Sequence, residues 1–285
     1  MTKIIAFVDG SVYSKSVCDH AAWIAKRSGA GVGLLHVLGP RETADGADLS
    51  GAISLGARTA LMEQLAGLDA ERAKLMGHRG RAILEDAAAI VAGEGVADVT
   101  TQLRHGDFAQ TVAEQEAGAA MVLIGKRGEG STMEAEYSRI GLHLERILRA
   151  ATKPVLIASR AFKPITKVLV AWDGQASVRR AVEIMAQDPL FAGLEVRLVT
   201  VGAATEAGTR SLESARAALA GAGLVVEAQT VEGDVAEVIA SMAESEGFGL
   251  VVMGSYGHSR LRSLVLGSTA TDLIARCKLP LFVVR

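Results

Sequence analysis

The chain contains two copies of one sequence pattern. The segment Lys3–Gly10, KIIAFVDG, matches Lys167–Gly174, KVLVAWDG. Four further segments match in the same order: Leu35–Val37 with Val199–Val201, Gly106–Ala109 with Gly233–Ala236, Gly125–Gly128 with Gly254–Gly257, and Pro154–Ile157 with Pro280–Val283. An ordered repeat of this length indicates two copies of one structural unit. We therefore expect two domains, residues 1–161 and 162–285.

The first copy carries an insertion. Matching residues lie 164 positions apart near the N-terminus but 127 apart at Gly106, so 37 additional residues precede this glycine. They fall at about 41–70 and include Ser54–Leu68, where the spacing of Ala and Leu predicts an added helix. We expect this helix to serve packing or an interface rather than chemistry.

Short apolar runs alternate with amphipathic segments in both halves. The runs predict strands at 3–8, 32–38, 98–104, 121–124, 154–159, 167–172, 195–202, 225–231, 250–253 and 280–285. The segments predict helices near 13–28, 70–92, 141–151, 176–187, 207–221 and 268–277, and after Asp107 and Asp234. This alternation predicts an α/β fold with two Rossmann-like domains, each a mostly parallel five-stranded sheet with helices on both faces. Ligands of such sheets bind at the carboxyl ends of the strands.

Charge and hydropathy narrow the class of protein. A net charge of -2 and an isoelectric point near 6.3 lack the basic character of nucleic-acid-binding proteins, so we expect no nucleic-acid partner. No apolar run approaches the length of about 18 residues that a membrane span needs. We therefore expect no membrane contact and a cytoplasmic location. Cys18 and Cys277 lie far apart without a Cys-x-x-Cys motif, which favours two buried, reduced thiols.

A glycine motif in the second half carries the strongest functional signal. Gly254-Ser-Tyr-Gly257 follows the fourth strand, and nine residues later Gly267-Ser268-Thr269 precedes a helix. Glycines let backbone N–H groups approach an anion, and a helix N-terminus adds unpaired N–H groups and a positive dipole end. Ser268 or Thr269 either caps the helix or donates a hydroxyl to phosphate. The competing interpretation is a glycine-rich turn before an ordinary capped helix.

Further residues fall at the same edge of the sheet. Asp173 follows the first strand of the second half, where its carboxylate either accepts hydrogen bonds from a ribose or adenine group or caps the helix near Ser177. Val201 ends the second strand and is a candidate wall for an adenine ring. The expected nucleotide site comprises Trp172, Asp173, Val201, Met253, Gly254, Gly257, His258, Gly267, Ser268 and Thr269.

Together these residues resemble the universal stress protein family, whose nucleotide-binding members carry Gly-x-x-Gly, nine residues, then Gly-Ser or Gly-Thr. Gly254, Gly257, Gly267 and Ser268 match that pattern, and the acid of the family falls on Asp173. The resemblance covers nearly the whole chain twice. It implies an adenine nucleotide (ATP, AMP or ADP, with Mg²⁺ as a candidate companion) bound along the strand ends. It also implies pairing of two such domains through their last strands, within one chain or in a homodimer.

The first half departs from the pattern of the family. Its candidate residues for a weaker second site are Asp9, Val37, Gly125, Gly128 and Gly141. However, 12 residues rather than nine separate Gly128 from Gly141, and Leu142 stands where the second half has Ser268. Because leucine cannot donate a hydrogen bond to phosphate, we expect at most one tight site per chain.

Other functions remain as alternatives. The chain contains no Walker-type Gly-x4-Gly-Lys-Ser/Thr motif and no Gly-x-Ser-x-Gly nucleophile motif. We therefore expect a stress-response regulator that binds nucleotide and acts on an unidentified protein partner, rather than a fast enzyme. The alternatives are a slow ATP hydrolase, with His258 near the phosphates, and an interaction scaffold whose pockets hold no nucleotide.

Overall fold

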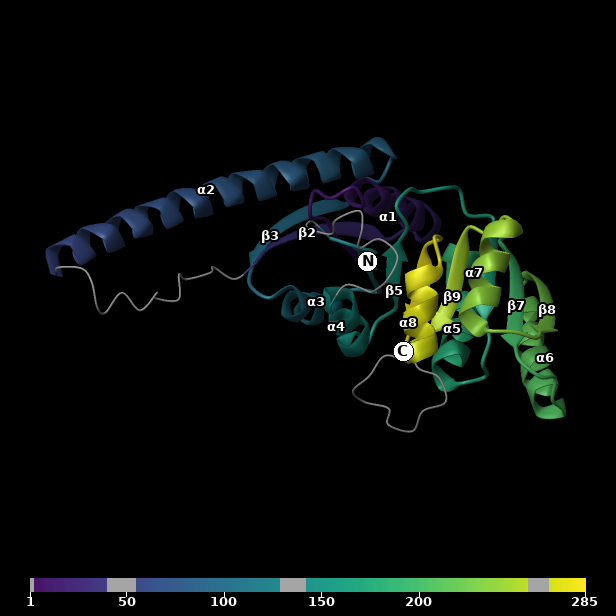
Figure 1. Ribbon diagram of the computed structural model, residues 1–285. Helices are drawn as coiled ribbons and strands as arrows, with labels where there is room; N and C mark the ends of the chain where they lie inside the picture. The colour runs from purple at the N-terminus through teal and green to yellow at the C-terminus, as the bar shows by residue number, and fades with distance from the viewer. Residues whose placement is uncertain (1–2, 40–54, 129–141, 256–266) are drawn as a thin grey trace.

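The computed structural model describes residues 3–39, 55–128, 142–255 and 267–285 (Figure 1). The first half contains β1 (Lys3–Phe7), α1 (Ser14–Ser28), β2 (Gly31–Leu38), α2 (Leu55–Gly93), β3 (Val99–His105), α3 (Phe108–Glu116), β4 (Met121–Gly125), α4 (Leu142–Ala150) and β5 (Val155–Ala158). The second half contains β6 (Lys167–Ala171), α5 (Ala176–Gln187), the 3₁₀ turn η2 (Pro189–Phe191), β7 (Glu195–Val201), α6 (Glu206–Gly221), β8 (Val225–Val231), α7 (Val235–Ser245), β9 (Leu250–Gly254), α8 (Ser268–Arg276) and β10 (Leu281–Val284). These elements follow the order expected from the sequence.

The strands form one continuous sheet in the order β3-β2-β1-β4-β5-β10-β9-β6-β7-β8. Neighbouring strands within each half are parallel. The exception lies at the centre, where β5 and β10 pair antiparallel and Phe282 stands opposite Leu156. The expected α/β class is therefore confirmed, and the last strands of the two halves pair within one chain.

Helices cover both faces of the sheet. Alternate residues of β1 show the two sides, because Ile4 belongs to the buried cluster that contains side chains of α1, α2, α5 and α6, while Ile5 belongs to the cluster that contains side chains of α3, α4, α7 and α8. A strand covered on both faces must be apolar at every position, which explains the continuous apolar runs in the sequence. Because the carboxyl ends of β1, β2 and β4 meet at one edge, and those of β6, β7 and β9 at another, each half presents its loops on one edge of the sheet.

Residues 55–70 of the insertion form part of one helix of 39 residues, α2, and residues 41–54 lie outside the described residues. The sequence predicts two helices, Ser54–Leu68 and about 70–92, and this separation is wrong. Nothing between them stops a helix, since the segment has no proline and a single interior Gly67 costs only about 1 kcal/mol. The stretch from Glu63 to Arg72 is exposed throughout, and in Figure 1 this end of α2 extends away from the sheet.

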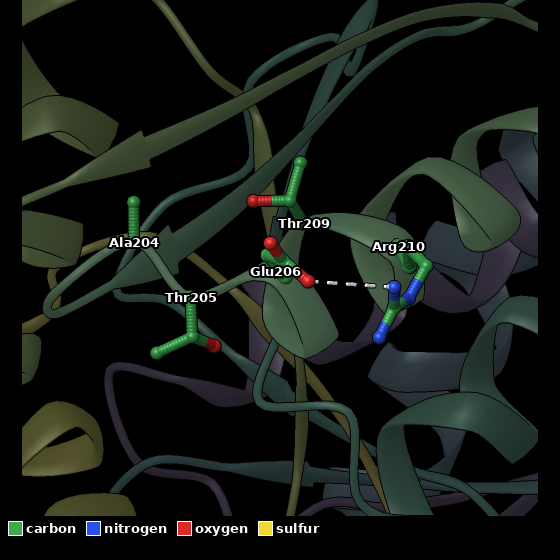
Figure 2. Close-up of a pocket in the computed structure, with 5 residues that line it drawn as sticks. All are labelled: Ala204, Thr205, Glu206, Thr209 and Arg210. Atoms are coloured by element: carbon green, nitrogen blue, oxygen red, sulfur yellow. Dashed lines mark ion pairs between the residues drawn. The ribbon is translucent and has the colours of Figure 1, made fainter.

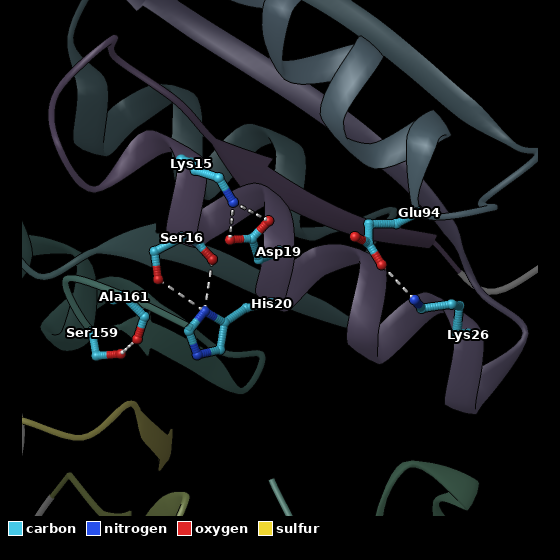
Figure 3. Close-up of polar contacts among 8 residues, drawn as sticks. All are labelled: Lys15, Ser16, Asp19, His20, Lys26, Glu94, Ser159 and Ala161. Carbon is cyan, nitrogen blue, oxygen red and sulfur yellow. Dashed lines mark hydrogen bonds and ion pairs between the residues drawn. The ribbon is translucent and has the colours of Figure 1, made fainter. Parts of the chain in front are cut away.

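The other end of α2 packs tightly on β2 and β3. Gly80 permits this approach, because a Cβ atom there would lie 2.7 Å from Cδ1 of Leu103 and 2.9 Å from Cδ2 of His36. The helix α1 lies beside α2, and Lys26 forms a 2.7 Å ion pair with Glu94 just after α2 (Figure 3). These contacts attach the long helix firmly at its C-terminal end.

Side chains of the first half also contact the second half. Arg27 donates from Nε to the carbonyl oxygen of Leu190 at 2.6 Å. His20 meets Phe162 edge-to-face at 4.9 Å, and its Nδ1 donates to the carbonyl oxygen of Ser16 at 2.6 Å (Figure 3). The two halves are thus joined by a shared sheet and by the packing of α1. None of the helices in the described ranges is both long and apolar enough to span a membrane.

Candidate functional site

The site of the second half lies where β6, β7 and β9 end. Trp172 and Met253 are buried, Val201 and Gly254 are partly buried, and Asp173 is exposed. The N–H of Gly267 approaches the carbonyl oxygen of Ser255 at 3.5 Å, which brings the start of α8 to the end of β9. The structure therefore gathers most of the expected residues at one edge of the sheet. Gly257 and His258 lie outside the described residues.

Within the described residues, no side chain caps the N-terminus of α8. Its N-cap residue is Gly267 and Ser268 is already helical, so of the two alternatives for Ser268 and Thr269, the structure does not support capping of the helix. Both side chains are exposed, and within the described part of the chain no side chain makes a cap hydrogen bond to this helix start. Unpaired N–H groups with a positive dipole end favour an anion at this position.

The helix α6 provides a contrast in the same half. Thr205 caps α6 by accepting from the N–H of Gly208 at 3.1 Å. A hollow of about 360 Å³ lies beside this cap, where Glu206 and Arg210 form an ion pair (Figure 2). Because Thr205 already accepts from the N–H of Gly208, one fewer N–H group at this helix start is open to a ligand.

Two hydroxyl groups at the edge of the second half are buried without a hydrogen-bond partner within the described part of the chain. They are Oγ1 of Thr200, near the end of β7, and Oγ of Ser255, directly after β9. A buried hydroxyl without a partner carries a free-energy cost of about 1–3 kcal/mol. The sequence analysis named neither residue as a site candidate: Thr200 stands alone near a strand end, and Ser255 lies within the Gly254–Gly257 motif at a position where the motif specifies no residue type.

The acidic residues after β1 and β6 organise turns. Oδ1 of Asp173 accepts from the N–H of Gln175 at 2.8 Å. Asp9 accepts in the same way from the N–H of Ser11 at 2.9 Å and from the hydroxyl of Ser14 at 3.1 Å. Each carboxylate is thereby held at the sheet edge by the turn that leads into the next helix.

The first half encloses a cavity of about 480 Å³ at its strand ends. The structure brings together four of the five expected residues on its wall: Asp9, Val37, Gly125 and Gly128. The fifth, Gly141, lies outside the described residues. The wall also includes residues that the sequence did not indicate, among them His36, Met76, Phe108, Lys126 and Arg127. Met76 belongs to α2 but lies outside the inserted residues at about 41–70, so a packing or interface role for the insertion stays a prediction.

Polar groups of the cavity are fixed by hydrogen bonds. His36 donates from Nδ1 to the carbonyl oxygen of Val8 at 2.7 Å, which leaves Nε2 as an acceptor. Asp107 caps α3 through the N–H of Gln110 and pairs with Arg146 at 3.2 Å. The backbone hydrogen bond and, after it, the Arg146 guanidinium lower the pKa of Asp107. This wall therefore combines apolar surface with charged groups of both signs.

The first glycine of each motif serves packing against the protein. A Cβ atom on Gly254 would lie 2.2 Å from Oγ of Ser177, and one on Gly125 would lie 2.8 Å from Cβ of Tyr13. Both neighbours stand at the start of the helix that follows the first strand of their half. The structure shows that these glycines allow the start of a helix to approach, and the expected approach of an anion stays a prediction. Among the described residues, no three His, Cys, Asp or Glu side chains cluster as metal ligands do.

Comparison with known proteins shows which family has this architecture. The sequence profile of the universal stress protein family matches residues 1–159 and 202–285. The universal stress protein Slr1230 of Synechocystis is 31% identical over 289 residues, which cover 100% of both chains. The chain therefore belongs to the universal stress protein family.

A solved structure that covers both halves agrees with the fold. The crystal structure of a universal stress protein from Archaeoglobus fulgidus covers 99% of this chain and 96% of its own, with a TM-score of 0.72 and 20% identity. A universal stress protein solved in complex with cAMP covers 43% of this chain and 98% of its own, with a TM-score of 0.37 and 23% identity.

Proposed function

We propose that this protein is a stress-response regulator whose second half binds ATP or a close relative. The observation that carries the proposal is the N-terminus of α8, which begins beside the end of β9 and has no side-chain cap within the described residues. Phosphate oxygens would accept from these N–H groups and from the hydroxyls of Ser268 and Thr269. The unpartnered hydroxyls of Thr200 and Ser255 support a polar ligand or loop at the same edge.

The nucleoside end of the ligand fits the other side of the site. Asp173 would accept hydrogen bonds from ribose hydroxyls or the adenine amino group, and Val201 would contact the ring. The sequence carries neither a Walker-type motif nor a Gly-x-Ser-x-Gly nucleophile motif, so we infer binding rather than rapid hydrolysis. Turnover of ATP above about 1 per second, in the usual range of enzymes, would overturn this part of the proposal.

We infer a second, weaker site in the first half. The cavity of about 480 Å³ lies within the usual range of small-molecule pockets, which is about 300–1,000 Å³. Leu142 begins α4 as Ser268 begins α8, so this site lacks the hydroxyl of the second half. Two equal high-affinity sites per chain in a titration would contradict the inferred asymmetry. The weaker site would thus belong to the domain 1–161 and the tight site to the domain 162–285.

The decisive experiment replaces Ser268 by leucine, the residue that stands at the matching position, Leu142, in the first half. The substitution Ser268→Leu removes the hydroxyl at the start of α8, and it should weaken ATP binding about tenfold or more, since hydrogen bonds to charged groups are strong. Thr209→Leu is the matched control, because Thr209 is exposed in the first turn of α6. Calorimetry should show wild-type affinity for the control. Equal affinity in both variants, with no nucleotide released from denatured wild-type protein, would favour an interaction scaffold instead.

A further inference from the structure

A lysine of the first half binds the end of a helix in the second half. Lys126 follows β4, and its Nζ donates to the carbonyl oxygens of Ala275 at 3.0 Å and Cys277 at 2.7 Å. Ala275 lies in the last turn of α8, and Cys277 is its C-cap residue. The last carbonyl groups of a helix have no partner within the helix, and a cation there also complements the negative end of the dipole. Lys126 is therefore a C-terminal cap supplied from the opposite half.

The reverse contact exists as well. Arg285, directly after β10, donates from Nη1 to the carbonyl oxygen of Arg149 at 2.7 Å. Arg149 lies in the last turn of α4. Each half thus sends one cation across the β5–β10 pair to the C-terminal end of the last helix of the other half. The two helices held in this way are those that begin immediately after the third motif glycine of each half, Gly267 and Gly141.

Because the ammonium of Lys126 is partly buried, it must keep its carbonyl acceptors. The ammonium lies between the two halves, and its burial lowers the pKa of Lys126. An ammonium with carbonyl acceptors in such a place keeps a fixed geometry, because moving away would leave both the cation and the carbonyl oxygens without partners. The position of α8 along its own axis is accordingly tied to the loop after β4.

We propose that Lys126 is a positioning residue for the nucleotide site of the second half. It holds the C-terminus of α8, and because a helix of nine residues is stiff, it thereby sets where the N–H groups at Ser268 stand. At 1.5 Å per residue, α8 is about 13 Å long, so Lys126 acts on the nucleotide through the helix and without touching it. Lys126 also lines the cavity of the first half, so the residue connects the two ligand-binding regions. This inference rests on the proposed function for its effect on affinity, although its effect on α8 does not.

Two measurements on the full-length chain test the proposal. The first is hydrogen exchange in residues 268–277 without nucleotide, and the second is ATP affinity by calorimetry. In Lys126→Met, exchange in α8 should rise about five- to thirtyfold, and ATP affinity should fall by a similar factor. Lys126→Arg keeps a cation with several donors and should restore most of both. Lys163→Met removes an exposed lysine from the segment of chain that links β5 to β6, and it should change neither the exchange in α8 nor the ATP affinity.

A second variant separates the positioning role from general loosening. Arg285→Gln releases α4, so exchange should rise in residues 144–150 while α8 keeps its protection. If Lys126→Met does not fold, Lys126→Gln, which retains one amide donor, should give a smaller change in the same direction. Wild-type exchange in α8 and wild-type ATP affinity in Lys126→Met or Lys126→Gln would overturn the inference. Failure of the wild-type protein to bind ATP would instead remove the proposed function, and exchange in α8 would still decide whether Lys126 holds the helix.

Discussion

Asp9 and Gly128 lie directly against each other, so that a Cβ atom on Gly128 would stand 3.1 Å from Oδ2 of Asp9. Asp9 follows β1 and Gly128 follows β4, which are neighbours in the sheet. The contact closes one wall of the first-half cavity and shows that the loop after β4 covers the acid. Asp173 occupies the matching position in the second half, which allows a paired test of the two acids.

Asp173→Asn should weaken ATP binding about tenfold or more, because it replaces a charged hydrogen-bond acceptor with a neutral one. Asparagine keeps the oxygen that accepts from the N–H of Gln175, so the turn before α5 and the thermal midpoint should be preserved. Asp9→Asn should have a much smaller effect on the tight site. Isothermal titration of both variants measures this difference, and a larger loss in Asp9→Asn would reverse the assignment of the tight site.

Gly254→Ala should lower the free energy of unfolding by about 1–3 kcal/mol, the usual cost of forcing an extra group into packed structure. The new Cβ atom would lie 2.2 Å from Oγ of Ser177 and 3.3 Å from the backbone N of Val178, so one end of α5 must shift. Gly221→Ala is the matched control, because no atom lies within 4 Å of its Cβ position and the residue is helical. Urea denaturation should show no loss of stability in the control.

Stability should fall as the pH rises above about 8.5, where an ordinary thiol begins to ionise. Burial raises the pKa of Cys18 to about 12 and that of Cys277 to about 11. The unfolded chain releases these protons first, so the stabilisation is complete below the unfolded value and is lost as the pH rises through the folded values. Urea midpoints from pH 8 to pH 10.5 should decline less steeply in Cys18→Ala than in the wild type. Identical slopes would show that the thiol does not contribute.

Phe282→Ala should destabilise the protein by about 3–5 kcal/mol, as expected for a fully buried aromatic side chain. Phe282 lies on β10 opposite Leu156 of β5 and meets Phe191 edge-to-face at 5.5 Å. Trp23 reports on the first half and Trp172 on the second, so the variants Trp23→Phe and Trp172→Phe isolate the two signals. Both signals should shift together in the Phe282→Ala background. A shift in the second half alone would show that the central strand pair does not couple the halves.

The sequence predicts the strands well because their signal is local. The run Leu250–Met253 is apolar at every position, and the structure covers it on both faces. The helix boundary near Asp69 is different, since neither Ser54–Leu68 nor the following segment contains a residue that ends a helix. Amphipathic periodicity shows that a helix forms, but only stop signals show where it ends, and α2 has none at that point.

The candidate site is only partly predictable for a related reason. Asp9, Val37, Gly125 and Gly128 stand in matching motif positions, and the structure brings them to one cavity. Lys126 lies between two motif glycines, yet its ammonium binds residues 149 and 151 positions away. A contact of this range depends on the antiparallel pairing of β5 and β10, and a motif read within one half contains no information about the other half.

The length of α2 has a consequence for how the whole molecule moves in water. With 39 residues at about 1.5 Å each, the helix is about 58 Å long, which exceeds the diameter of about 49 Å of a compact sphere with the radius of gyration of about 19 Å expected for a chain of this size. A rod that extends past the sheet increases friction far more than it increases mass. The protein should therefore tumble more slowly about its short axes than about the helix axis, and its small-angle scattering should indicate an elongated particle.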